Sequence, residues 1–123
     1  MTAACGNFSL FMEENQSPLA CDMTAITADQ RDSHLAASRE LFSQIRETRE
    51  LSNGYEFHFD PNLLKKLADF VALEKLCCPF LNFVIEIEAE NGPVWLRLTG
   101  REGVKAFIRE EISGLIGLGN VES

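Results

Sequence analysis

Little in this 123-residue sequence marks the common specialised classes of protein. Its 11 Lys and Arg residues are outnumbered by 19 Asp and Glu residues and form no cluster. A nucleic-acid partner is therefore not predicted, because nucleic-acid binding needs concentrated positive charge. No apolar run is long enough to cross a bilayer, so the sequence predicts no transmembrane helix and no membrane partner.

Signatures of the familiar catalytic sites are also missing. There is no Gly-rich phosphate loop and no paired-histidine metal motif, and His34 and His58 fit no Ser-His-Asp set. The sequence therefore does not favour an enzyme. Glu13 and Glu14 interrupt the only apolar stretch near the N-terminus, and no basic segment precedes it, so we expect no secretory signal. We therefore predict a cytoplasmic location, where thiols stay reduced.

The composition is that of one globular domain, with 46% hydrophobic and 24% charged residues. We predict an α+β fold, in which about three helices cover one face of a small, mainly antiparallel sheet of roughly three to four strands. The domain is expected to span residues 21–116. Residues 1–20 are weakly patterned, with an edge strand over residues 8–12, and residues 117–123 form a frayed tail.

Hydrophobic periodicity predicts the individual elements. Helical spacing of apolar residues predicts helices over residues 27–50, 61–76 and 104–115. Alternation of apolar and polar residues predicts strands over residues 55–59, 83–89 and 94–98. The first helix begins with a capping box formed by Thr27 and Gln30, and the second begins after Asp60 and ends before Pro79.

The last two strands are expected to form a hairpin, because Asn-Gly at residues 91–92 is a strong signal for a two-residue loop. Such a loop would place Glu86 opposite Arg97. Pro93 has no N–H group to close the turn, which leaves a longer loop with a shifted register as the alternative.

Four cysteines occur in the sequence: Cys5, Cys21, Cys77 and Cys78. Adjacent Cα atoms are about 3.8 Å apart, whereas disulfides usually join Cα atoms about 4.4–6.8 Å apart. A bond between Cys77 and Cys78 would therefore be strained. The remaining spacing is not typical of a disulfide scaffold, so we expect free thiols or metal ligands.

Glu74 is anomalous, because it occupies a position on the apolar face of the second helix. A buried acid is costly unless it is paired, protonated or bound to a ligand. Steps of three and four residues place Cys77 and Cys78 beside it. Pro79 draws Cys78 out of helical geometry, which would allow the two thiols to converge near the carboxylate.

The first interpretation of this cluster is a site for a soft ion. Thiolates prefer zinc and more thiophilic metal or metalloid ions, and we predict Cys21, Cys77, Cys78 and Glu74 as ligands. His58 is a further candidate, although strand alternation places it opposite the apolar side chains of its strand.

Two other interpretations stay open. Two nearby thiols can trap a sulfenic acid, which would make the chain a thiol redox protein. Alternatively, the cysteines fill the core of a structural or interaction module, and Glu74 pairs with Arg39 or Arg46. Nucleophilic catalysis is disfavoured because it needs a base beside the thiol. We expect His34 on the exposed surface of the first helix.

Trp95 is the other unusual residue, because it is predicted on the outer face of the sheet, which no helix covers. A large aromatic side chain there predicts a covered surface. The cover would be the N-terminal segment or a partner, and a homodimer through this face is one such arrangement.

The segment from Glu74 to Phe83 resembles a family of small, uncharacterised bacterial proteins with a Glu-x-x-Cys-Cys-Pro-Phe motif. Further resemblance lies in residues 19–25, 93–100 and 103–105. The resemblance implies an association with heavy-metal or arsenic handling, hence thiol–metal chemistry, and implies no enzyme class. It singles out Cys21, Cys77, Cys78 and Glu74, whereas Cys5 lies outside the matching region.

Overall fold

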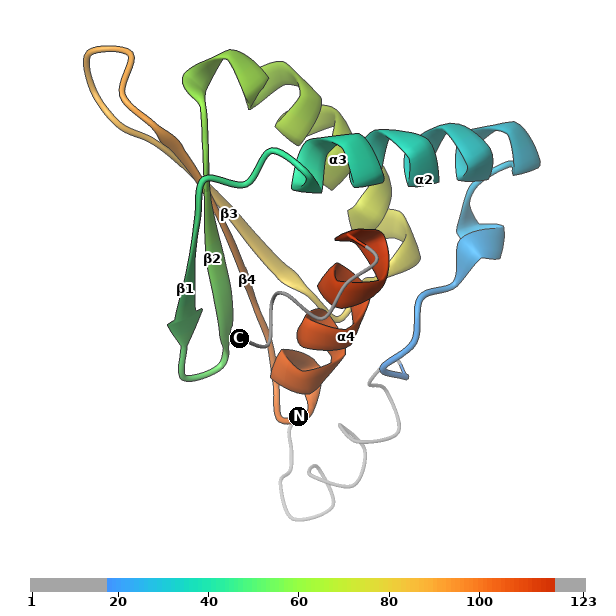
Figure 1. The fold of residues 1–123 in the computed structure, drawn as a ribbon. Helices are drawn as coiled ribbons and strands as arrows, with labels where there is room; N and C mark the ends of the chain where they lie inside the picture. Colours follow the sequence, from blue (N-terminus) through green and yellow to red (C-terminus); the bar gives the residue numbers. More distant parts are fainter. Residues whose placement is uncertain (1–17, 117–123) are drawn as a thin grey trace, which may run out of the picture.

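The computed structural model describes residues 18–116 of the chain. Its elements in chain order are η1 (Met23–Ala25), α2 (Ala28–Phe42), β1 (Glu47–Leu51), β2 (Gly54–Phe59), η2 (Pro61–Leu63), α3 (Leu64–Cys77), β3 (Asn82–Ile87), β4 (Val94–Thr99) and α4 (Val104–Ile116). The strands form one antiparallel sheet in the order β1-β2-β4-β3. The three α-helices lie on the same side of this sheet (Figure 1), so the predicted α+β fold is confirmed.

Two predicted segments lie outside the described residues. These are the edge strand over residues 8–12 and the tail over residues 117–123. Among the helices of residues 18–116, none combines the length and apolar character needed to cross a membrane.

The first predicted helix is wrong in its second half. α2 ends at Phe42, and Glu47–Leu51 forms the strand β1, which pairs along its whole length with β2. The charged residues of this segment suit the exposed face of a helix as well as they suit an exposed edge strand. Only the pairing with β2, which the local pattern does not contain, decides between the two.

The predicted helix stop at residues 52–54 is instead a turn between two strands. Ser52 and Asn53 connect β1 to β2, and Gly54 is the first residue of β2. A Cβ atom on Gly54 would overlap with the carbonyl oxygen of Leu98 on β4. The close approach of β4 therefore requires glycine at this position.

Both predicted helix starts are confirmed by their capping contacts. Thr27 Oγ1 accepts a hydrogen bond from the Gln30 N–H at 3.2 Å, and Gln30 Oε1 accepts one from the Thr27 N–H at 2.9 Å. Asp60 accepts a hydrogen bond from the Asn62 N–H at 2.8 Å, at the start of η2, which leads into α3. These contacts satisfy N–H groups that the first turn of a helix leaves unpaired.

The pairing register of the β3–β4 hairpin is shifted by two residues from the predicted register. Glu86 lies opposite Trp95 rather than opposite Arg97. The two-residue turn lies one residue earlier than predicted: Glu90 and Asn91, with φ angles of 61° and 58°, are its central residues, and the Gly92 N–H closes it by donating to the Ala89 carbonyl oxygen at 3.1 Å, so no N–H from the proline is needed. Because the shift is two residues, each side chain keeps its predicted face of the sheet.

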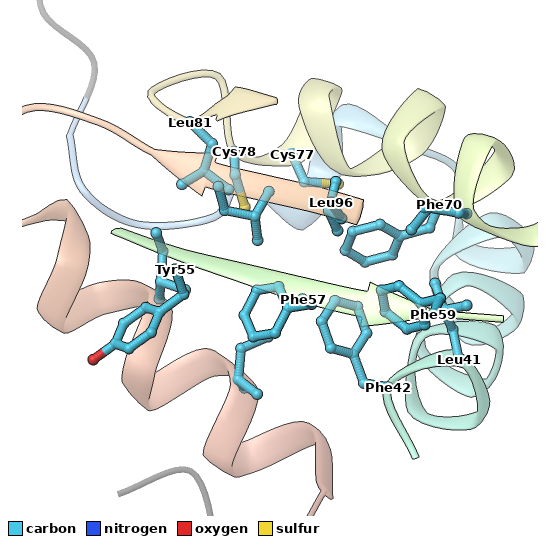
Figure 2. Close-up of a cluster of buried hydrophobic side chains, with 14 of the residues drawn as sticks. Leu41, Phe42, Tyr55, Phe57, Phe59, Phe70, Cys77, Cys78, Leu81 and Leu96 are labelled. Carbon is cyan, nitrogen blue, oxygen red and sulfur yellow. The ribbon is translucent and has the colours of Figure 1, made fainter. Parts of the chain in front are cut away.

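The core lies between the inner face of the sheet and the helices, and an aromatic cluster occupies its centre (Figure 2). Phe42 of α2 meets Phe57, Phe59 and Phe70 edge-on, with ring centroids 5.5, 5.9 and 5.1 Å away. Edge-to-face contacts of this kind add to the stabilisation from burial. Because Phe57 and Phe59 lie on β2 and Phe70 on α3, the cluster holds α2 against both the sheet and α3.

Shortening a core side chain on the central strand β4 should destabilise the fold. Leu96 is fully buried, so we expect Leu96→Ala to lower the free energy of unfolding by about 2–5 kcal/mol through the cavity it leaves. Val84, 43% exposed on the outer face of β3, is the control. Val84→Ala should change the free energy of unfolding by less than about 1 kcal/mol. Urea unfolding measures both, and equal losses would contradict this placement of the core.

Candidate functional site

The candidate site lies at the C-terminal end of α3. Cys77 is the last helical residue, and the backbone of Cys78 leaves the helical region with φ −125° and ψ 71°. The N–H of Cys78 still donates to the carbonyl oxygen of Glu74 at 2.8 Å. Pro79 explains this ending, because the residue before a proline avoids helical geometry. The predicted departure of Cys78 from the helix is confirmed.

Residues 18–27, which we call the N-terminal strap, lie against this helix end. The N–H of Asp22 donates to the carbonyl oxygen of Cys77 at 2.8 Å. This bond satisfies one of the carbonyl groups that the last turn of a helix leaves unpaired. Leu19 and Met23 of the strap pack against the core. The strap is therefore held to the fold by a backbone hydrogen bond and by apolar contacts.

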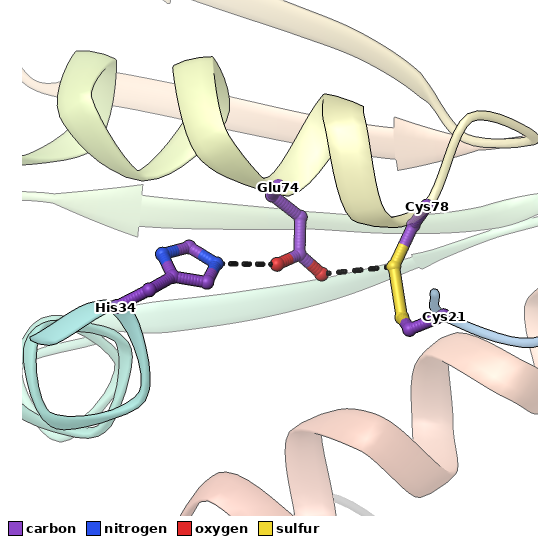
Figure 3. The surroundings of a disulfide bond; sticks show 4 residues. All are labelled: Cys21, His34, Glu74 and Cys78. Atoms are coloured by element: carbon purple, nitrogen blue, oxygen red, sulfur yellow. Dashed lines mark hydrogen bonds and ion pairs between the residues drawn. A yellow bond between two sulfur atoms is a disulfide. The ribbon is translucent and has the colours of Figure 1, made fainter. Parts of the chain in front are cut away.

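The strap brings Cys21 to Cys78, with the Cα atoms 4.7 Å apart, and a disulfide joins the two residues (Figure 3). The expectation of free thiols is therefore wrong for this pair, whereas Cys77 is free as expected. The two bonded cysteines are 57 residues apart in sequence. No local pattern reports such a contact, because it depends on the path of the strap in three dimensions.

Glu74 lies between the disulfide and His34 (Figure 3). Its Oε2 atom is 3.4 Å from Cys78 Sγ, and its Oε1 atom is 2.8 Å from His34 Nε2. The side chains of Glu74 and His34 are only 16% and 5% exposed. Hydrogen bonding to the histidine offsets the cost of burying the carboxylate. The ligand atoms of Cys21, Glu74 and Cys78 all lie within 4.8 Å of one another.

The expected surface position of His34 is wrong. His34 shares the buried face of α2 with Ser38, Leu41 and Phe42. Its ring stacks on Phe70 of α3, with centroids 5.6 Å apart. The four-residue steps from His34 through Ser38 to Phe42 are the signal that could have located this face. Ser38 is buried and donates a hydrogen bond to the carbonyl oxygen of His34 at 2.7 Å, and His34 reaches Glu74.

Cys77 is the one predicted ligand that the fold separates from the others. Its side chain is 1% exposed in the core (Figure 2) and lies outside the cluster of Cys21, Glu74 and Cys78. Burial, reinforced by the negative charges of Glu74 and Asp22, raises the pKa of the Cys77 thiol above its ordinary value. A thiol that resists ionisation is a poor ligand and a poor nucleophile.

A second carboxylate stands near Glu74. Glu111 of α4 and Glu74 both line a cavity of about 20 Å³, whose other walls are apolar. Desolvation, together with the negative charges of Glu74 and Glu110, raises the pKa of the Glu111 carboxyl. The surroundings of Glu74 therefore favour a positively charged ligand over an anion.

Trp95 and His58 lie on the outer face of the sheet, away from the helices, as strand alternation predicts. Trp95 is only 7% exposed. Arg49 lies over its indole ring at 4.4 Å, His58 stacks on it at 4.5 Å, and its Nε1–H donates to Glu88 at 2.7 Å. Side chains of the chain itself thus cover the indole, and the homodimer through Trp95 stays a prediction.

No protein-family model, curated protein or solved structure matches the chain. The function of the site is therefore inferred from the chemistry and geometry of its own residues.

Glu74 pairs with His34 rather than with the predicted Arg39 or Arg46, and a double-mutant cycle should detect this. We expect a coupling free energy of about 1–3 kcal/mol between His34→Ala and Glu74→Ala, because each variant leaves a poorly solvated group without its partner. The control cycle, with Arg39→Ala, should give less than about 0.5 kcal/mol. Urea unfolding with the disulfide intact measures both. Equal coupling of Glu74 to Arg39 would contradict the observed pairing.

A thiol count should detect the disulfide. In a Cys5→Ser chain purified in air, denaturation without reductant should expose a single thiol, that of Cys77. Reduction before denaturation should expose three thiols, because Cys21 and Cys78 are then free as well. Titration with a chromogenic disulfide reagent in guanidinium gives the counts. Three thiols without reduction would show that Cys21 and Cys78 are not joined.

Proposed function

We propose that the reduced chain binds a soft metal or metalloid ion through Cys21, Cys78 and Glu74. The observation that supports this proposal is the cluster of their ligand atoms, all within 4.8 Å of one another. Thiolate ligands select zinc and softer, more thiophilic ions, and a carboxylate oxygen is an accepted third ligand for zinc. A ligand set with two sulfur atoms argues against calcium and magnesium, which prefer oxygen ligands.

The anchoring of the ligands supports the same proposal. Cys78 and Glu74 belong to the end of α3, and the strap that carries Cys21 is tied to that helix end through Asp22 and Cys77. This hydrogen bond does not involve the sulfur atoms, so it keeps the two thiols close after the disulfide is reduced. Ligands that the fold already holds together lose less conformational entropy on binding an ion.

The residues around Glu74 orient its carboxylate and add negative charge to the site. The hydrogen bond from His34 fixes the direction of the carboxylate, a contact that commonly strengthens metal sites. The nearby Glu111 adds negative charge when it is ionised. Ion binding requires a reduced site, because a thiolate rather than a disulfide sulfur is the ligand. The cytoplasmic location expected from the sequence would supply reducing conditions.

Titration of the reduced chain with Cd²⁺ under anaerobic conditions tests the proposal, with thiolate-to-metal charge-transfer absorption as the readout. In a Cys5→Ser background we expect one Cd²⁺ per chain. Cys21→Ser and Cys78→Ser should each weaken the affinity by at least about 100-fold, and Glu74→Gln by about tenfold. The matched control is Cys77→Ala, which should keep the affinity within about threefold, because the Cys77 thiol is buried and resists ionisation.

Three results would contradict the proposal. One is Cd²⁺ binding that survives both Cys21→Ser and Cys78→Ser. Another is binding that only Cys77→Ala abolishes in a chain that circular dichroism shows to be folded. The third is a folded, reduced chain that binds neither Cd²⁺, Zn²⁺ nor arsenite, which would leave the disulfide with a structural role.

A further inference from the structure

We propose that the folded chain undergoes thiol–disulfide exchange with low-molecular-weight thiols, and that the exchange begins at the sulfur of Cys21. This inference rests on the proposed function in one respect, since opening the disulfide would make the ion site available. The exchange itself needs no ion.

The two sulfur atoms of the disulfide differ in their access to solvent. Cys78 is 0% exposed and belongs to the buried core cluster. Cys21 is partly exposed and stands between the exposed residues Ala20 and Asp22 on the strap. In Figure 3, Cys21 lies on the side of the strap, whereas Cys78 lies on the side of α3, beside Glu74. Which sulfur a thiolate attacks depends on access, and access favours Cys21.

The exchange balances with two equivalents of thiol, written RSH. The first RSH loses its proton to the buffer, and the thiolate forms a bond to Cys21 Sγ. The bond between Cys21 and Cys78 breaks, and its electron pair passes to Cys78 Sγ, which takes up a proton. A second RS⁻ thiolate then attacks the sulfur of the RS group that is bound to Cys21, which releases Cys21 as a thiolate that takes up a proton. The products are RSSR and the two cysteine thiols, so two RSH are oxidised and one disulfide is reduced.

The surroundings of the released Cys78 thiol suit this direction of exchange. Cys78 Sγ lies 3.4 Å from Glu74 Oε2, so once the released sulfur has taken up its proton the S–H group can donate a hydrogen bond to the carboxylate. The other oxygen of Glu74 is held by His34. The protonated Cys78 thiol, the product of this step, therefore has a hydrogen-bond acceptor already in place, which avoids the cost of an unsatisfied buried polar group.

Opening of the disulfide at Cys21 would couple the redox state of the chain to ion binding. While Cys21 and Cys78 are bonded to each other, neither offers a thiolate. Exchange at Cys21 releases both sulfurs, and the anchored strap keeps them close. The reverse reaction with RSSR would close the pair again.

The test uses reduced glutathione with the oxidised, full-length Cys5→Ser chain, without denaturant and without any ion. Samples are quenched with acid at short times, alkylated and mapped by mass spectrometry. We expect glutathione on Cys21 in at least about tenfold excess over glutathione on Cys78. The buried Cys77 is the internal control and should remain unmodified. In denaturant, the preference for Cys21 should fall to within about twofold, because access then no longer differs.

Two outcomes would overturn the inference. Glutathione found mainly on Cys78 would show that exchange enters from the other sulfur. Opening that is no faster than global unfolding, measured by exchange at several urea concentrations, would show that the folded chain does not take part. Failure of the proposed function is distinguishable, because the Cd²⁺ titration starts from a chain already reduced and does not depend on how the disulfide opens.

Discussion

The site depends on the way in which α3 ends. Pro79 takes Cys78 out of helical geometry, so the neighbouring residues Cys77 and Cys78 serve different purposes. Cys77 packs into the core, whereas Cys78 meets the strap and Glu74. The same ending leaves the carbonyl of Cys77 free to accept from Asp22. In a longer helix, that carbonyl would bond to a later N–H of the helix, and the strap would lose its anchor.

The aromatic cluster supplies the second half of the site by holding α2 beside α3. Phe42 contacts both β2 and Phe70, and His34 stacks on the same Phe70 ring from the buried face of α2. His34 is thereby placed opposite Glu74 at hydrogen-bond distance. A continuous line of polar and sulfur atoms thus runs from α2 through α3 to the strap. Its surroundings are largely apolar, and His34 provides the hydrogen bond that the buried carboxylate of Glu74 needs.

Several features could be read from the sequence because they depend on residues close together in the chain. The capping box of Thr27, the start at Asp60 and the end before Pro79 are all set within one helical turn. The anomaly of Glu74 on an apolar face is also local, and it pointed to the helix end at which Glu74, Cys78 and Cys21 lie together. The segment Glu47–Leu51 was misassigned, since its charges are compatible with either element until β2 pairs with it.

The sequence by itself thus determined the fold class, the positions of most helices and strands, and the proximity of Glu74 to Cys78, because periodicity and proline act within a few residues. Tertiary structure alone decided three things: that Cys21 meets Cys78, that His34 rather than an arginine pairs with Glu74, and that Cys77 is excluded from the cluster. Each of these depends on the relative placement of elements that are far apart in the chain. Such placement follows from the packing of the whole core, which no single segment encodes.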